Sequence, residues 1–342
     1  GVSDDFNYHY ETIKNFKSKT IYEISHHRMI SYNSNWLFLI SIFSINYLSS
    51  TIFILSSLIY AILIFDTYTM YQKYLKNGYY LTGLFYFFIL IFFLGVLNKY
   101  KDFGTDIPGV IISFYVLIII IYYIFDKQIK NTNFILFLVL PLVVFAFIIK
   151  ITNSLLFLLL FLLIINFNLR FIDYKILLFS LIFTLLWFLQ NYTISGCLIW
   201  PIEITCFKNN ELAIDEYYFI ESFAKGDIAT QMKVDGFSWI KIWAMNHFKK
   251  LIEIYLIFFL IVFLPILFFY LKKKINRKDL FINYNYLILF LLICLTNLIW
   301  FINAPAYRFG IFYNLSLIIL ISLPFWVKLL KFDFNFFLKY FK

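Results

Sequence analysis

The sequence predicts an all-α, polytopic integral membrane protein, because long apolar stretches alternate with short polar gaps. Hydrophobic residues make up 63% of the 342 residues, whereas about half is usual in soluble domains. Nine stretches of roughly 15–21 residues are almost free of charge, and ~20 apolar residues cross a bilayer as a helix. The expected spans are about 48–65, 79–98, 109–125, 133–149, 154–169, 176–192, 251–271, 283–302 and 309–327.

The charges sort onto alternate sides of these spans. With residues 1–47 on the first side, the second side carries 15 basic and five acidic residues, and the first side carries 14 of each. Lys and Arg accumulate in the short cytoplasmic loops of membrane proteins. We therefore expect the second side, with the basic loop 272–279 and the C-terminus, in the cytoplasm. Residues 1–342 form one transmembrane domain of a bacterial inner membrane, with its first side periplasmic or extracellular.

The first outer loop, residues 1–47, predicts helices that lie at the membrane interface. Phe6, Tyr10, Ile13 and Phe16 have the spacing of an amphipathic helix over 4–17. The apolar stretch 36–48 is short for a span, and it favours an interfacial or re-entrant helix. The sequence opens with polar residues on the outer side, so we expect a membrane helix to precede it. That helix would raise the count to ten and place both termini in the cytoplasm.

The large outer loop, residues 193–250, holds most of the remaining polar sequence. We expect an extended start over 198–204, an acidic stretch over 211–221 and an amphipathic helix over 239–250. Cys197 and Cys206 share this loop, where an oxidising compartment permits a disulfide, although their spacing alone leaves the pairing open.

The prolines and the net charge have simple interpretations. Pro141, Pro265 and Pro324 fall in expected spans, where we expect them to kink helices. A net charge of +10 would favour nucleic acid binding in a soluble protein. Here the basic residues border the cytoplasmic helix ends, so we expect contacts with membrane lipids and no nucleic acid partner.

The first outer loop also brings together groups that can do chemistry. On a helix, Asp4 faces Tyr8 and Asp5 faces His9 through the i,i+4 relation. A carboxylate at a helix start, flanked by hydrogen-bonding side chains, can act as a general base or bind a divalent cation. Capping of the helix by Asp4 or Asp5 is the simpler alternative and stays open.

Four strings carry a resemblance to a known family. The string Asp4-Asp5-x-x-Tyr8-His9 resembles the first-loop acidic motif of the GT-C superfamily of lipid-linked-sugar glycosyltransferases. It also looks like the opening of an uncharacterised family of bacterial multipass membrane proteins related to them. The other strings that fit this family follow in order along the chain: Arg28 with Asn33-Ser34-Asn35-Trp36, then Ser195-Gly196-Cys197-Leu198-Ile199-Trp200-Pro201, then Pro305-Ala306-Tyr307-Arg308-Phe309-Gly310.

The resemblance implies sugar transfer from a polyprenyl-phosphate-linked sugar to an acceptor glycan or lipid at the outer membrane face. Asp4 would be the base that deprotonates the acceptor hydroxyl, with Asp5 as the second candidate. Arg308 would stabilise the phosphate of the leaving group, because its fork of donors suits phosphate. Anchoring of Arg308 to lipid headgroups is an equal alternative on physical grounds.

Other outer residues are candidates for substrate or metal contacts. We expect Tyr8, His9, Arg28, Asn33 and Trp200 to contact the substrate or its phosphate, although Arg28 beside His26 and His27 also fits a solvated loop. Asp106 either starts the next helix as a cap or helps to hold a metal near Asp4. The cofactor is unknown, and a divalent cation stays open. Glu203 could contact an acceptor, although a solvated loop position is the simpler interpretation.

Two other function classes compete with the transferase. A polysaccharide polymerase or ligase of the O-antigen type also has many helices and a large late outer loop. Those enzymes rely on paired arginines in outer loops, and the loop 193–250 contains no Arg. A transporter should show ionisable residues or broken helices near mid-membrane, and the expected spans hold almost none.

Overall fold

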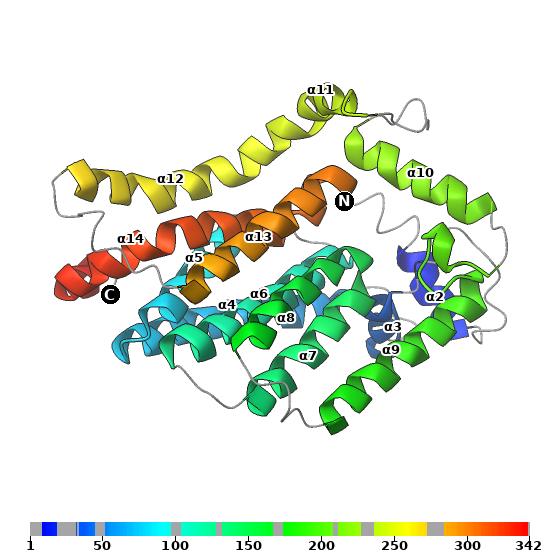
Figure 1. Cartoon of the computed structure of the whole chain (residues 1–342), viewed down its shortest axis with the longest axis horizontal. Coiled ribbons are helices and arrows are strands. Elements are labelled where there is room, and N and C mark those ends of the chain that lie inside the picture. The colour runs from blue at the N-terminus through cyan, green and yellow to red at the C-terminus, as the bar shows by residue number, and fades with distance from the viewer. Residues whose placement is uncertain are drawn as a thin grey trace.

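The fold is helical throughout the part of the chain that can be described (Figure 1). A computed structural model describes residues 9–18, 32, 34–44, 52–96, 104–127, 132–166, 174–207, 211–226, 236–271 and 284–340. Within these ranges the extended backbone pairs only in an isolated bridge between Cys197 and Cys206. The all-α prediction is therefore confirmed for the described residues.

Nine apolar helices occupy the positions of the nine predicted spans. They are α4 (Ile52–Lys76), α5 (Tyr80–Val96), α6 (Asp106–Ile121), α7 (Thr132–Ile149), α8 (Phe157–Asn166), α9 (Tyr174–Ser195), α12 (Lys249–Leu271), α13 (Tyr284–Asn303) and α14 (Ile311–Tyr340). Six of them, namely α4, α6, α9, α12, α13 and α14, are long and apolar enough to cross a membrane, alone or with the turns that continue them. The other three are shorter apolar helices. The chain is a membrane protein.

Short helices and turns precede or connect the nine apolar helices. They are α2 (Tyr10–Ser18), α3 (Asn35–Phe43), α10 (Glu211–Lys225) and α11 (Trp239–Trp243), with π-turns η6 (Tyr122–Asp126) and η10 (Ala244–Phe248) and 3-10 turns η7 (Ile151–Leu156), η9 (Glu203–Thr205) and η12 (Tyr307–Phe309). Figure 1 shows α2, α3, α10 and α11 along the right and upper right of the molecule, while the C-terminus lies at the left. We call the side with these four helices the α10 end of the bundle.

Several predicted boundaries are wrong, for local physical reasons. The helix predicted over 239–250 is not separate, because α11 runs through η10 into α12 as one apolar segment, Trp239–Leu271. The start predicted as extended over 198–204 is mostly turn, closed by the Cys197–Cys206 disulfide. The acidic stretch is the helix α10, which buries Ala213, Glu216 and Ser222. Helix α4 continues to Lys76 and so includes Asp66 and Lys73, which were expected in a loop.

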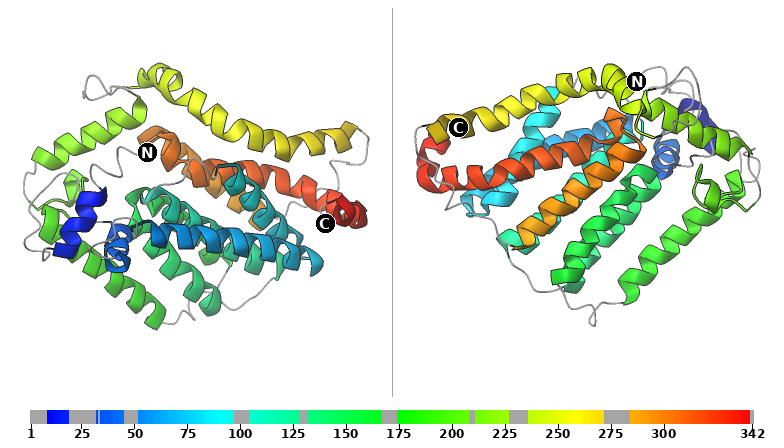
Figure 2. Two further views of the ribbon diagram at one scale, coloured as in Figure 1. Left: turned by 180° about the vertical axis from the view of Figure 1, so that it is seen from behind. Right: turned by 45° about the horizontal axis from the view of Figure 1, so that its top comes forward.

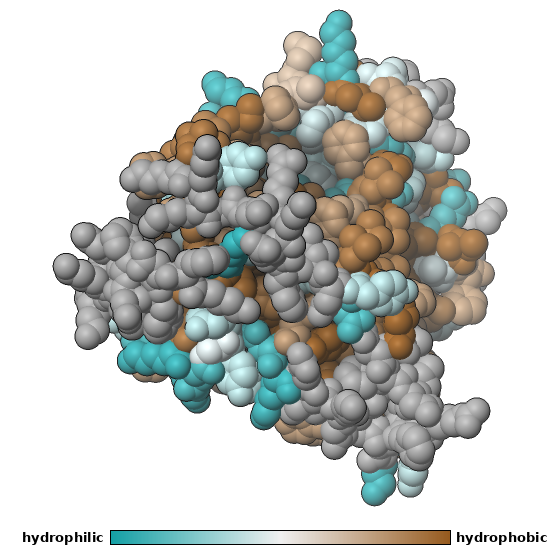
Figure 3. Space-filling model, turned by 60° about the vertical axis from the view of Figure 1, so that its left-hand side comes forward, coloured by the Kyte–Doolittle hydropathy of each residue, from teal (hydrophilic) through white to brown (hydrophobic). Residues whose placement is uncertain are grey.

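Helices α6 and α14 form the centre of the bundle. In their most apolar windows, 67% and 72% of the residues are buried, against 22% in both α9 and α12. Aromatic rings fill the centre; Phe114 of α6, for example, lies edge to face with Phe312 of α14. The right-hand view of Figure 2 shows α9 and α12 at opposite edges of the bundle. Beside the residues drawn in grey, Figure 3 shows apolar side chains exposed at the surface, as expected for helices that face lipid.

Polar contacts join helix ends on the side away from α10. The Thr82 amide and hydroxyl of α5 donate to Asp126 Oδ2, at the end of η6, over 2.9 and 2.6 Å. Nearby, the Tyr286 hydroxyl of α13 donates to the Leu320 carbonyl of α14. The contacts therefore hold together the end of α6 with η6 and the starts of α5 and α13, which the charge pattern assigned to one side, and they tie α13 to the middle of α14. Pro141, Pro265 and Pro324, where kinks were expected, lie inside α7, α12 and α14, respectively.

Candidate functional site

Three charged side chains from distant parts of the sequence meet at the α10 end. Asp106 is the first residue of α6, Lys150 directly follows α7, and Arg308 lies in η12 between α13 and α14. The Lys150 ammonium forms an ion pair with Asp106 Oδ1, and Arg308 Nε lies 4.0 Å from Asp106 Oδ2. The side chains of Lys150, Asp106 and Arg308 are 17%, 28% and 31% exposed. We call these three residues the charge cluster.

The turn after α7 holds Lys150 against the start of α6. The Lys150 amide still donates to the Ala146 carbonyl over 3.1 Å, and Asn153 Nδ2 donates to the same carbonyl over 2.9 Å. A Cβ at Gly109 of α6 would lie only 2.5 Å from Asn153 Nδ2. Glycine at this position therefore lets α6 approach the turn closely, which brings Asp106 within reach of Lys150.

Two tryptophans hold the turn that carries Arg308. Trp243 Nε1 donates to the Pro305 carbonyl over 2.8 Å, and Trp300 Nε1 donates to the Ala306 carbonyl over 3.2 Å. A Cβ at Gly310 would lie 2.4 Å from the Trp300 ring, so only glycine fits beside this indole. The backbone on both sides of Arg308 is therefore fixed by packing, and the guanidinium is held next to Asp106.

Aromatic rings surround the two cations. The Phe309 ring centroid lies 4.0 Å from Lys150 Nζ and 5.2 Å from Arg308 Cζ. The Phe223 ring of α10 lies 5.4 Å from Arg308 Cζ. A cation over an aromatic face is attracted to the ring, and the attraction grows when water is excluded. The rings therefore keep both cations in a partly dry setting.

The electrostatics of the charge cluster favour a further anion. Two cations share one carboxylate, which leaves a net charge of +1 on the three side chains. Burial, and then the neighbouring Arg308 charge, hold the pKa of the Lys150 ammonium well below its usual range. A lowered lysine pKa means that the positive charge is costly where it lies. A phosphate or carboxylate of a ligand would reduce that cost.

The structure brings together two of the predicted site residues, Asp106 and Arg308. It places Asp106 after the Thr105 cap position, in the first turn of α6, where a negative charge complements the helix dipole. Among the described residues, no group of three or more His, Cys, Asp and Glu could hold a metal. Asp106 is instead flanked by cations. The predictions for Asp4, Asp5, Tyr8, Arg28 and Asn33 concern positions outside the described residues.

Ser34 and Trp36 anchor the first outer segment beside the charge cluster. Ser34 Oγ accepts a hydrogen bond from the Trp36 amide at the start of α3. The same hydroxyl donates to the Ile149 carbonyl over 2.7 Å, one residue before Lys150. Trp36 is buried against Ile13 of α2. Helices α2 and α3 therefore pack next to the turn that carries Lys150.

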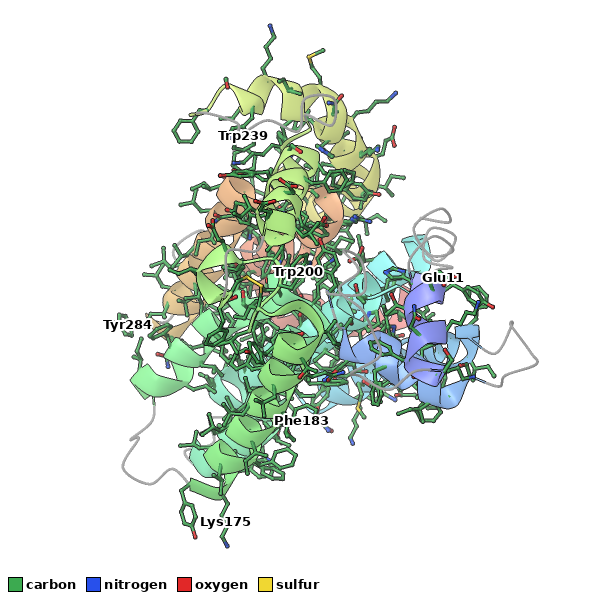
Figure 4. The ribbon with its side chains drawn as sticks, turned by 90° about the vertical axis from the view of Figure 1, so that its right-hand side faces the viewer. Glu11, Lys175, Phe183, Trp200, Trp239 and Tyr284 are labelled. Atoms are coloured by element: carbon green, nitrogen blue, oxygen red, sulfur yellow. A yellow bond between two sulfur atoms is a disulfide. The ribbon has the colours of Figure 1, made fainter. Side chains whose placement is uncertain are left out.

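Trp200 and His9 occupy buried positions of their own. Trp200 packs with Cys197 and Ala213, next to the Cys197–Cys206 disulfide that Figure 4 shows beside it. Gly196 precedes this loop with φ +74°, a conformation that favours glycine. Glu203 in the same loop is exposed. His9 is 6% exposed at the start of α2. The substrate contacts expected of His9 and Trp200 stay predictions.

The sequence analysis did not select Lys150, which turns out to be central to the charge cluster. A signal for it exists in the sequence. Lys150 is the one charged residue in the four-residue outer gap 150–153, between two predicted spans. A charge in so short an outer turn lies at the membrane edge, and there an ionisable group needs a partner. Arg308 lies in a similarly short gap, and the two turns form neighbouring parts of the same site.

Comparison of the sequence with known proteins identifies a family for this chain. A family model described as a domain of unknown function (DUF8201) matches residues 1–315. The chain belongs to this family. The match includes Asp106, Lys150 and Arg308, so the charge cluster lies inside the DUF8201 domain. No curated protein and no solved structure matches the sequence.

Proposed function

We propose that this DUF8201 protein is a GT-C-like membrane glycosyltransferase. It would move a sugar from a polyprenyl-phosphate donor to an acceptor glycan or lipid at the outer face of the bacterial inner membrane. The observation that carries the proposal is the meeting of Lys150 and Arg308 around a single carboxylate, Asp106, at one end of the helices. This cluster has the charge needed to bind the phosphate of a lipid-linked sugar.

The chemistry requires positive charge where the phosphate leaves. When the acceptor hydroxyl attacks the anomeric carbon, the bond to the lipid phosphate breaks and negative charge builds on the phosphate oxygens. Donors already aimed at that position stabilise the transition state more than the ground state. In this proposal Arg308 contacts the departing phosphate directly, and Lys150 supplies a second charge from the end of α7.

The proposed orientation rests on the charge pattern of the loops. The side away from α10 carries the net charge of +10, so it would face the cytoplasm together with the C-terminus. The α10 end would then be periplasmic or extracellular. All nine apolar helices would cross the membrane in this arrangement, the shorter ones by packing against longer neighbours. The disulfide at the α10 end supports a periplasmic or extracellular position for that end, because disulfides persist in oxidising compartments.

The proposed general base is Asp4, with Asp5 as the alternative. Both precede the described residues, but the segment that follows them is anchored beside the site through the hydrogen bond from Ser34 to the Ile149 carbonyl. A base in this segment would lie on the same side of the membrane as Arg308. It would accept the proton of the acceptor hydroxyl as the new glycosidic bond forms.

Transfer assays on the full chain in lipid nanodiscs test the proposal. We expect Arg308→Ala to slow transfer from a polyprenyl-phosphate sugar about 100-fold, because removing one such donor costs about 10²–10³ in rate. Asp4→Asn should abolish transfer, and Asp5→Asn should retain it. Lys241→Ala, an exposed cation in α11, is the matched control for Arg308. If Arg308→Ala and Asp4→Asn both transfer sugar at the wild-type rate while folded normally, the proposal is wrong.

A further inference from the structure

A cavity lies between α7 and α9, on the lipid-facing side of the bundle. Its volume is about 260 Å³, and its walls are almost entirely apolar. The residues that line it are Pro141, Leu142, Val144 and Phe145 of α7 and Phe179, Ser180 and Phe183 of α9. Above it the two helices touch, because Trp187 of α9 packs on Phe147 and Ile148 of α7. The cavity is therefore closed toward the α10 end by this contact, and it lies between the second half of α7 and the first half of α9.

One polar group lines this apolar cavity. Ser180 is 5% exposed, and its hydroxyl oxygen is buried with no hydrogen-bond partner among the described residues. A hydroxyl in a membrane helix ordinarily bonds the carbonyl one turn earlier, as Thr184 Oγ1 does with the Ser180 carbonyl over 2.8 Å. A buried hydroxyl without a partner is unfavourable. A ligand with an acceptor at this depth would satisfy it.

A basic residue lies at the end of α9 nearest the cavity. Lys175 precedes Ser180 by five residues, which is about 7.5 Å along a helix axis. Lys175, Phe179 and Phe183 follow at i, i+4 and i+8, so they share one face of α9. Figure 4 shows Lys175 at the lower end of this helix and Phe183 farther up. Ser180 lies on the neighbouring, buried side of α9 that faces α7, between Phe179 and Phe183 along the axis. From its open end, α9 therefore offers a cation and then a hydroxyl donor, with the two aromatic rings beside that hydroxyl.

We propose that this groove binds one glycerophospholipid. The order of groups along α9 is the order of groups in that lipid, which has a phosphate, then ester carbonyls, then acyl chains. The phosphate would lie at Lys175, an ester carbonyl would accept a hydrogen bond from Ser180 Oγ, and an acyl chain would lie along Phe179, Phe183 and Val144. A polyprenyl phosphate has no ester carbonyl to place opposite Ser180. The site is separate from the charge cluster and does not depend on the proposed function.

Lipid titration of the full chain, followed by native mass spectrometry, tests this site. The delipidated protein receives phosphatidylglycerol with ester-linked chains or its ether-linked analogue. We expect each chain to bind one molecule of the ester lipid. The ether lipid should bind about three- to tenfold more weakly, which is the effect of losing one hydrogen bond. Ser180→Ala should lower the affinity for the ester lipid by the same factor, and it should leave the affinity for the ether lipid unchanged.

Matched variants separate the site from general lipid contacts. Ser322→Ala removes a buried hydroxyl that already bonds the Ile319 carbonyl, so lipid affinity should stay at the wild-type value. Lys175→Gln should reduce the preference for phosphatidylglycerol over phosphatidylcholine, and Lys76→Gln, at the exposed end of α4, should not. Equal affinity for ester and ether lipids in the wild type, or a bound polyprenyl phosphate insensitive to Ser180→Ala, would overturn the proposal. Sugar transfer should persist in Ser180→Ala, so the two proposals can fail separately.

Discussion

Two turns at the α10 end are built from similar residues but do different things. The Pro305–Gly310 turn and the Cys197–Cys206 loop each pack a buried tryptophan and each depend on a glycine. The first turn presents Arg308 to Asp106, next to Lys150. The second is closed by its disulfide and by local hydrogen bonds, and it leaves Glu203 exposed. Charge that converges from several helices distinguishes a candidate site from a self-contained structural loop.

The largest effect should follow removal of the carboxylate between the two cations. We expect Asp106→Asn to lower the free energy of unfolding by about 3 kcal/mol, the low end for breaking a buried ion pair, because the cluster is partly exposed. Thermal unfolding in detergent measures this. Glu203→Gln in the disulfide loop should change the free energy of unfolding by less than about 0.5 kcal/mol.

The same variant tests whether the cluster attracts anions. Without the Asp106 charge, a short prenyl phosphate should raise the unfolding temperature of Asp106→Asn more than that of the wild type, because binding to the folded state stabilises it. An Asp106→Asn protein as stable as the wild type would show that the cluster is a solvated surface contact. The comparison between the two turns would then lose its basis.

Breaking the disulfide should lower the stability of the fold without slowing sugar transfer. Cys197 and Cys206 are separated by nine residues, and closing a loop of this size contributes about 2–3 kcal/mol. We expect the double variant Cys197→Ser, Cys206→Ser to unfold at lower temperature, and a reductant to shift the wild type equally. Sugar transfer below the unfolding temperature should stay within about twofold of the wild type. A much larger loss in a folded double variant would place Trp200 in the substrate site.

The sequence predicted the bundle better than it predicted the site. Apolar stretches of bilayer length are strong signals because each residue contributes to them, so every predicted span has a helix at its position. Arg308 could be selected because a charge at the membrane edge needs a partner, and Asp106 because it stands where a cap or a metal ligand is expected. Their meeting with Lys150 depends on long-range packing, on Gly109 beside Asn153 and on Gly310 beside Trp300. No local pattern encodes those contacts.

Turn structure was harder to predict for a related reason. The start of the loop 193–250 looked extended, yet the bond between Cys197 and Cys206 turns the chain back on itself. Spacing alone could not decide that bond. The helix expected over 239–250 has no end of its own, since its apolar face continues into α12 and packs through Trp243 on Phe301. Tertiary contacts, rather than local periodicity, set both boundaries.

The smallest effect should be a pH dependence that belongs to Lys150. Because its pKa lies well below the usual value, Lys150 loses its proton at a lower pH than an exposed lysine does. An anion binds the protonated form better, so affinity for a short prenyl phosphate should fall as pH rises, and the fall should come well below the usual lysine pKa of about 10.4. We expect a weakening of about three- to tenfold, the effect of losing one charged hydrogen bond, measured by isothermal titration.

Substitution by arginine sharpens this result. Arginine stays protonated across the whole range, so Lys150→Arg should bind the prenyl phosphate with nearly constant affinity. Lys241→Arg, at an exposed position of α11, should keep the wild-type pH profile. A wild-type profile that is flat, or a slope that survives in Lys150→Arg, would show that Lys150 does not face the bound anion. Arg308 would then be the cation of this turn that meets the phosphate, and Lys150 would serve to hold Asp106 at the end of α7.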